Sequence, residues 1–62
     1  MEQRTDTWVV IPAFNEAPVI GGVVAGVRAA FPHVLVVDDA SRDDTAAIAR
    51  SAGAYTAIHP LN

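Results

Sequence analysis

VLVVDDAS, residues 34–41, is the stretch of sequence that decides the fold. Its four apolar residues, three of them valine, predict a buried strand that ends where the two aspartates begin. A similar run, TWVVI at residues 7–11, lies upstream and predicts a strand covered on both faces, which Pro12 ends because proline cannot donate to a strand ladder. A shorter run, YTAI at residues 55–58, predicts a third strand before His59.

Two helices are expected between these strands. From about Glu16 to Phe31, apolar residues recur one, three and four positions apart and form one stripe. Asn15 is the expected N-cap, and Pro18 is tolerated in the first turn. The three glycines inside this segment weaken it intrinsically, so its stability has to come from packing on a sheet.

The second helix is predicted to run from residue 42 or 43 to Ser51. Ser41 can cap it, and Asp44 lies three positions further on, as in a capping box. Gly53 follows the last helical residues, where a C-terminal glycine cap belongs.

Strand, helix, strand, helix, strand is the pattern of an α/β fold with parallel strands and right-handed crossovers. We expect the spatial order third, second, first, with the first strand internal to a larger sheet. Residues 1–6 are expected to be a tail, and residues 7–62 half of a doubly wound domain. The chain stops just after a strand, without a closing helix, and so we expect a fragment of a longer protein.

Composition narrows the classes of function. The 62 residues contain no cysteine, and His33 and His59 lack metal-ligand spacing, so neither disulfides nor a structural metal are expected. Net charge is −3, and the four arginines are scattered, which argues against nucleic-acid binding. No leader pattern is visible, and the longest uncharged stretch, residues 17–27, is too short to span a membrane. We expect a soluble, cytoplasmic protein.

The candidate site lies at the carboxyl ends of the predicted strands, where open α/β sheets bind ligands. Three segments meet there: PAFNE at residues 12–16, DDAS at 38–41 and HPLN at 59–62. Asp38 and Asp39 point in opposite directions because they are neighbours at a strand end. One carboxylate can therefore face the crevice and accept hydrogen bonds from ribose hydroxyls or a base N–H. The alternative is that both aspartates only cap the following turn.

The other polar and aromatic residues of these segments have simpler structural roles open to them. The Phe14 ring can hold a flat base, or it can be an ordinary buried side chain. Asn15 and Glu16 fit a helix start equally well, and His59 fits a solvated loop.

The two longer segments resemble the signatures of family-two glycosyltransferases with the GT-A fold. VVIPAFNE, residues 9–16, is similar to the opening VVIPAYNE signature, and VLVVDDASRDDT, residues 34–45, is similar to the second, VVDDGSTDGT. HPLN, residues 59–62, is similar to the segment before the family's Asn-x-Gly stretch. The resemblance covers the chain from Trp8 onward, and the polyprenyl-phosphate (dolichyl-phosphate) sugar synthases are the subgroup it resembles most.

This resemblance implies a GT-A, Rossmann-like half that binds the nucleotide of a GDP- or UDP-sugar donor. Pro12, Phe14 and Glu16 would line the nucleotide pocket, and Val37 would touch the base through its backbone. Asp39 would hold the base or ribose, and Asp38 would support its loop.

The resemblance also implies parts that these residues do not supply. The family's DxD motif, catalytic base and acceptor site lie further along, so no residue here is assigned as catalytic or metal-binding. Mg²⁺ or Mn²⁺, a lipid-phosphate or saccharide acceptor, and any membrane association are expected of the full-length protein. Phe14 replaces the commoner tyrosine, and Ala40 and Asp44 replace glycines. Two rival classes stay open: a signalling receiver domain with Asp38 and Asp39 as its acidic pair, and a dinucleotide-binding Rossmann half, for which the glycine-rich turn is missing.

Overall fold

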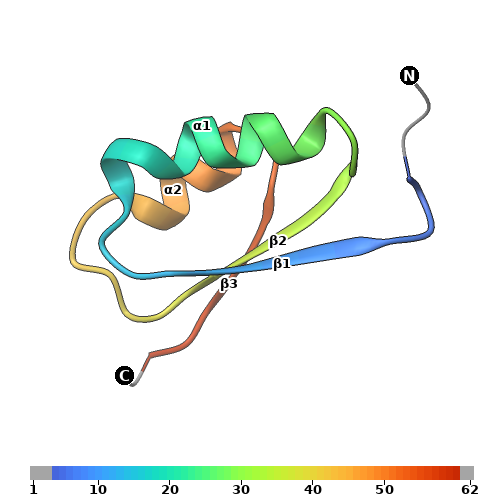
Figure 1. Cartoon of the computed structure of the whole chain (residues 1–62). Coiled ribbons are helices and arrows are strands. Elements are labelled where there is room, and N and C mark those ends of the chain that lie inside the picture. The colour runs from blue at the N-terminus through green and yellow to red at the C-terminus, as the bar shows by residue number, and fades with distance from the viewer. Residues whose placement is uncertain (1–3, 61–62) are drawn as a thin grey trace.

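The computed structural model describes residues 4–60, so part of the expected tail, residues 1–3, and the last two residues of the third segment lie outside it. Five elements follow one another along the chain (Figure 1). They are β1 (Trp8–Ala13), α1 (Ala17–Arg28), β2 (His33–Asp38), α2 (Thr45–Ser51) and β3 (Tyr55–Ile58). The predicted alternation of strands and helices is confirmed.

The three strands form one parallel sheet in the order β1-β2-β3, as predicted. Ala13 pairs with Asp38, and Asp38 pairs with Ile58, so all three strands end at the same level. The sheet fixes where the segments after β1, β2 and β3 begin. The fold is therefore α/β, with the strand order of a Rossmann-like half domain.

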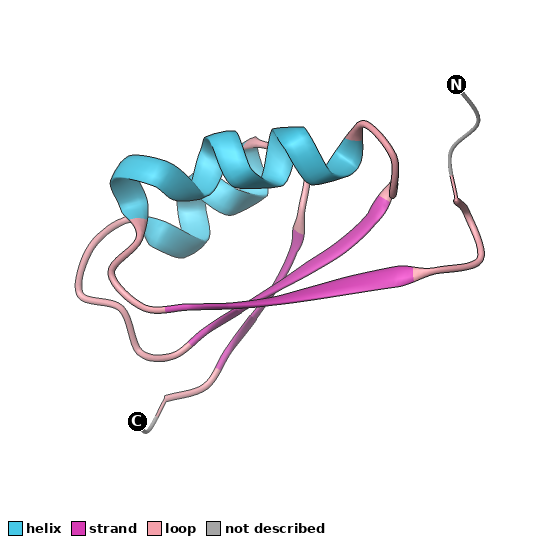
Figure 2. Ribbon diagram, viewed as in Figure 1, coloured by secondary structure: helices cyan, strands magenta, loops and turns pink. Residues whose placement is uncertain are grey.

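Both helices lie on the same side of this sheet, as Figure 2 shows. Two right-handed crossovers that step in the same direction across a sheet place their helices on the same face. The other face is open: Trp8, Val10 and Tyr55 are between 53% and 60% exposed. The prediction that the first strand is covered on both faces is therefore wrong within residues 4–60. The Trp8 ring instead stacks on His33, with ring centroids 4.9 Å apart, at the amino end of the sheet.

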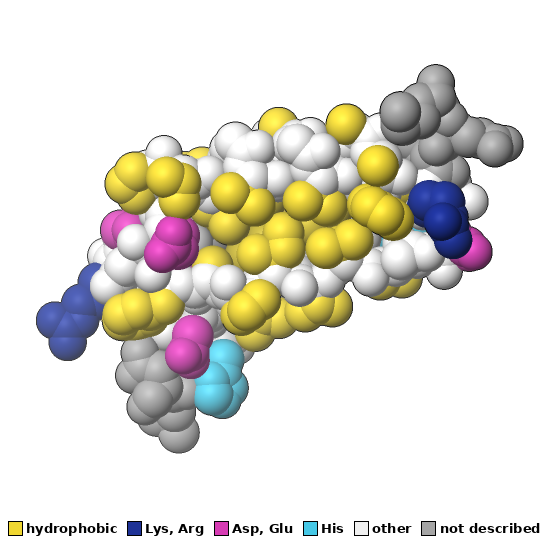
Figure 3. Space-filling model, in the orientation of Figure 1, with side chains coloured by type: hydrophobic (Ala, Val, Ile, Leu, Met, Phe, Trp, Pro, Cys, Tyr) yellow, Lys and Arg dark blue, Asp and Glu magenta, His cyan; other side chains and the backbone are white. Residues whose placement is uncertain are grey.

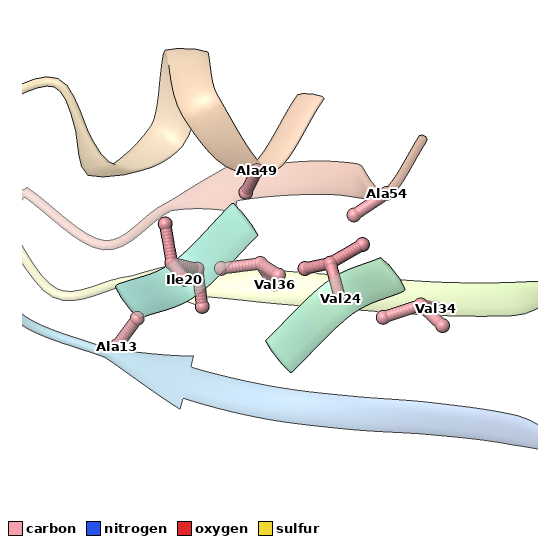
Figure 4. Close-up of a cluster of buried hydrophobic side chains, with 7 residues drawn as sticks. All are labelled: Ala13, Ile20, Val24, Val34, Val36, Ala49 and Ala54. Carbon is pink, nitrogen blue, oxygen red and sulfur yellow. The ribbon is translucent and has the colours of Figure 1, made fainter. Parts of the chain in front are cut away.

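A small core fills the space between the helices and the sheet (Figure 4). Ile20 and Val24 of α1 and Ala49 of α2 point toward Val34 and Val36 of β2. Ala13 and Ala54 complete this cluster. Because the buried side chains alternate along β2, its helix-facing row also carries Asp38 into the interior.

Two strands are longer than predicted. β1 continues through Pro12, which pairs with Val37, and ends at Ala13. Proline is tolerated there because β1 is an edge strand of this sheet, with one row of backbone groups facing no described neighbour. β2 runs from His33 to Asp38, one residue longer at each end than expected, and β3 has the predicted bounds.

α1 is shorter than predicted, from Ala17 to Arg28. The N–H groups of Ala30 and Phe31 both donate to the carbonyl of Val27, which closes the helix. Phe31 precedes Pro32, and a residue before proline is disfavoured in the helical conformation. The helix therefore ends before this position.

The predicted N-caps are wrong for both helices. Glu16 is the N-cap residue of α1 and Asp44 that of α2, and neither makes a side-chain cap hydrogen bond. Asn15 has φ 53°, in the left-handed region, and so it cannot begin the helix. The side chains expected to cap their own helices instead bond across to the other loop, as described below. Gly53, at φ 106°, is the predicted glycine after α2.

Candidate functional site

The three segments that follow the strands lie side by side, as the sequence predicts. The N–H of Asp39 donates to the carbonyl of Ala13 at 2.8 Å, and the N–H of His59 donates to the carbonyl of Asp38 at 2.8 Å. The strand ladder thus continues one residue past β2 and β3. This fixes the backbone of the aspartate pair between the turn after β1 and the end of β3.

Side chains from the β2–α2 loop and from the first residue of α2 accept hydrogen bonds from the start of α1. Three consecutive N–H groups, those of Asn15, Glu16 and Ala17, are bound in this way. Their acceptors are Ser41 Oγ at 2.8 Å, Thr45 Oγ1 at 2.9 Å and Asp43 Oδ2 at 3.2 Å. These N–H groups have no partner within their own helix, so the neighbouring loop supplies the missing caps.

Asn15 completes the connection from the other side. Its Oδ1 accepts a 2.8 Å hydrogen bond from the N–H of Arg42. The left-handed conformations of Asn15 and Ala40, at φ 53° and 60°, are held within these two turns. The two turns therefore form one hydrogen-bonded unit, and their relative position is fixed.

Asp43 and Thr45 form the hub of this unit. Thr45 is fully buried, and both its N–H and its hydroxyl donate to Asp43 Oδ1. The hydrogen bond from the Thr45 side chain, together with those from backbone N–H groups, holds the pKa of Asp43 below its ordinary value of 3.8. The ionised form of Asp43 is therefore the one that the folded chain stabilises.

The two neighbouring aspartates face different surroundings. Asp38 is 4% exposed, and its Oδ1 accepts a 3.1 Å hydrogen bond from the N–H of Ser41, so it supports the loop from inside. Asp39 is only half-buried and faces a shallow hollow at the rim. The opposite orientation expected of adjacent residues at a strand end is found.

The hollow is lined by Pro12, Ala13, Phe14 and Asp39 and holds about 180 Å³. Ligand pockets for whole small molecules are larger, about 300–1,000 Å³. The hollow therefore has room for one part of such a ligand. Its walls combine an exposed aromatic ring and a proline with one carboxylate.

His59 lies against the carboxylate of this hollow. Its Nδ1 is 2.9 Å from Asp39 Oδ1, and both side chains are partly open to solvent, at 64% and 43% exposure. Figure 3 shows acidic and histidine side chains touching at the lower end of the molecule. The sequence interpretation of His59 as a solvated loop residue missed this contact, because its partner is 20 positions away.

The predicted site residues are thus only partly brought together. Pro12, Phe14 and Asp39 surround the hollow. Val37 lies half-buried beside Pro12 in the sheet, and Glu16 is exposed at the start of α1; neither lines the hollow. The part each residue plays in binding stays a prediction.

The described part of the chain, residues 4–60, offers neither a metal-binding cluster nor a membrane-spanning helix. No three histidine, aspartate or glutamate side chains in this range come together as a group that could hold a metal ion. Within the same residues, neither helix is long and apolar enough to cross a membrane.

The strand order distinguishes the rival folds. In a receiver domain the first strand lies between the second and the third. Here β2 lies between β1 and β3, and the acidic pair follows the second strand. A Rossmann half has the observed order, but its glycine-rich turn after the first strand is replaced by PAFNE.

The chain is similar to known proteins in sequence and in fold. An uncharacterized protein of Methanocaldococcus jannaschii is 37% identical over 60 residues, which cover 95% of this chain and 25% of that protein. A mycobacterial protein of known crystal structure superposes with a TM-score of 0.76 at 33% identity, over 82% of this chain and 18% of that one. The chain thus spans about a quarter or less of the length of these relatives. Residues 8–59, which include all five elements, match the sequence profile of glycosyl transferase family 2, and the chain belongs to this family.

Proposed function

We propose that this chain forms the nucleoside-binding rim of a glycosyltransferase that uses a nucleotide-sugar donor. The observation that carries the proposal is the hollow between Phe14 and Asp39, at the carboxyl ends of β1 and β2. In an open α/β sheet, this is the end where a ligand is expected.

The walls of the hollow suit a nucleoside. A flat base can stack on the aromatic ring of Phe14. The Pro12 ring offers a rigid apolar surface beside it. The Asp39 carboxylate can accept hydrogen bonds from two ribose hydroxyls or from a base N–H. Because the volume matches part of a ligand only, the phosphates and sugar would extend beyond the hollow.

The other predicted site residues would act around the bound nucleoside. Asp38 holds the loop that carries Asp39, through its bond to the N–H of Ser41. Val37 pairs with Pro12 one residue before the end of β2, where its backbone can approach the edge of a base. Glu16, at the start of α1, would border the same pocket.

The donor and acceptor are proposed from the family resemblance. We propose a GDP- or UDP-sugar as donor and a polyprenyl phosphate as acceptor, in a protein that works at the cytoplasmic side. Among residues 4–60, no group of three acidic or histidine side chains could hold the Mg²⁺ or Mn²⁺ proposed for the reaction. No DxD motif occurs in these 62 residues, and we expect no sugar transfer from them alone.

Calorimetric titration of UDP and GDP into the chain tests the proposal. We expect one of the two to bind weakly, and Asp39→Ala to abolish the heat of binding. Asp44→Ala is the matched control, because Asp44 is an exposed carboxylate of the same loop that does not line the hollow. Equal binding by wild type and Asp39→Ala would refute the assignment.

A further inference from the structure

We propose that His59 is a positioning residue that orients the Asp39 carboxylate for nucleoside recognition. This inference rests on the proposed function, since it concerns how Asp39 meets its ligand. It begins from a contact that links the third strand to the hollow, the 2.9 Å approach of His59 Nδ1 to Asp39 Oδ1.

The position of His59 is fixed through its backbone. Its N–H donates to the carbonyl of Asp38 at 2.8 Å, which extends the pairing of β2 and β3 past their ends. The N–H of Asp39 is bound in turn to the carbonyl of Ala13. The imidazole and the carboxylate therefore start from two neighbouring backbones that the sheet holds together.

The contact has a defined polarity. An ionised carboxylate only accepts hydrogen bonds, so Nδ1 is the donor and carries a proton. This bond holds Oδ1 and restricts rotation of a carboxylate that is 43% exposed. A carboxylate ordered before binding loses less conformational entropy when the nucleoside arrives.

His59 itself does not line the hollow, whose walls are Pro12, Ala13, Phe14 and Asp39. It therefore acts through Asp39. Substitutions that imitate one or the other nitrogen of the imidazole ring can test this role. In an asparagine, the amide nitrogen can occupy the place of Nδ1, whereas in a glutamine it reaches the place of Nε2. The two substitutions therefore separate the loss of this one donor from the loss of a polar side chain.

The experiment measures UDP and GDP affinity for wild type and for His59→Ala, His59→Asn and His59→Gln, with thermal unfolding of each variant alongside. We expect His59→Ala to weaken binding about two- to tenfold, the range for one hydrogen bond in a partly exposed site. His59→Asn should restore most of the affinity and His59→Gln should not, with unfolding temperatures unchanged.

Two results would overturn the inference. If wild type binds and Asp39→Asn weakens binding, but His59→Ala binds like wild type, His59 has no positioning role and the proposed function stands. If wild type shows no saturable binding of either nucleotide, the proposed function and this inference both fail.

Discussion

Thr45 Oγ1 accepts a 2.9 Å hydrogen bond from the N–H of Glu16, although 29 positions separate the two residues. The hydroxyl also donates to Asp43, and the Thr45 side chain is fully buried. One side chain at the start of α2 thus supplies the hydrogen-bond acceptor for a backbone N–H at the start of α1. This contact joins the two turns that place Phe14 and Asp39 on a common rim.

Thr45→Val is expected to destabilise the fold by about 1–3 kcal/mol. Valine has the same shape but no hydroxyl, so the N–H of Glu16 is left without its acceptor. Urea unfolding measures the change. Thr56→Val is the matched control, because the Thr56 hydroxyl accepts a hydrogen bond from the exposed Arg50 side chain and lies in a strand that suits valine. A Thr45→Val chain as stable as Thr56→Val would contradict the role given to this hydroxyl.

Asp43 makes stability depend on pH in the acid range. Its pKa is lowered in the folded chain, chiefly by the Thr45 hydrogen bond, so the unfolded chain takes up a proton first as the pH falls. The stabilisation is fully present above about pH 3.8 and is lost as the pH falls through the lowered folded value. Urea unfolding at a series of pH values should show that the difference in unfolding free energy between wild type and Asp43→Asn decreases in that window. A difference in unfolding free energy between wild type and Asp43→Asn that does not change with pH would rule out the linkage.

Ala40→Gly is expected to stabilise the fold by about 0.5–1 kcal/mol. Ala40 has φ 60°, where a Cβ costs about 1–2 kcal/mol, and glycine removes this cost at some expense in unfolded-chain entropy. Ala47→Gly, in the exposed interior of α2, should destabilise by about 1 kcal/mol instead. Thermal unfolding shows whether each substitution raises or lowers the stability of the fold. Destabilisation by both substitutions would show that Ala40 is not strained.

Val24→Ala is expected to cost roughly 2 kcal/mol, since Val24 is fully buried between α1 and β2 and its methyl groups leave a cavity. The adjacent Val23 is 44% exposed, and Val23→Ala should change stability by less than about 0.5 kcal/mol. Chemical denaturation of both variants tests whether α1 packs on the sheet through the face seen here. The reverse order of costs would mean that the helix is rotated.

The elements were predictable because each is encoded by residues close together in sequence. Apolar runs and the 3.6-residue stripe predicted three strands and two helices, and parallel pairing followed from the alternation. What local pattern could not predict is the partner of each polar side chain. Asn15 and Ser41 are good N-cap residues for the helices next to them, yet each bonds to the other's loop.

The site was predictable to a similar degree. Asp38 and Asp39 separate into an interior and a rim position because adjacent strand residues alternate, and this follows from sequence alone. The contact of His59 with Asp39 depends on how β3 lies against β2, and nothing near His59 in the sequence indicates it. The open face of the sheet was missed because a continuous apolar run indicates that a strand is buried, but it does not show which residues cover each face.

The most direct test of the shared nucleoside-binding rim is a nuclear magnetic resonance titration with UDP and GDP. The amides of Phe14, Asp39 and His59 report on the rim, and the Trp8 indole reports on the amino end of β1, roughly 16 Å from Ala13 at the usual rise of a strand. The account predicts saturable shifts of the rim amides, an unmoved Trp8 signal, and loss of both saturation and shifts in Asp39→Ala. Saturable shifts confined to other residues, or none at millimolar nucleotide, would contradict it.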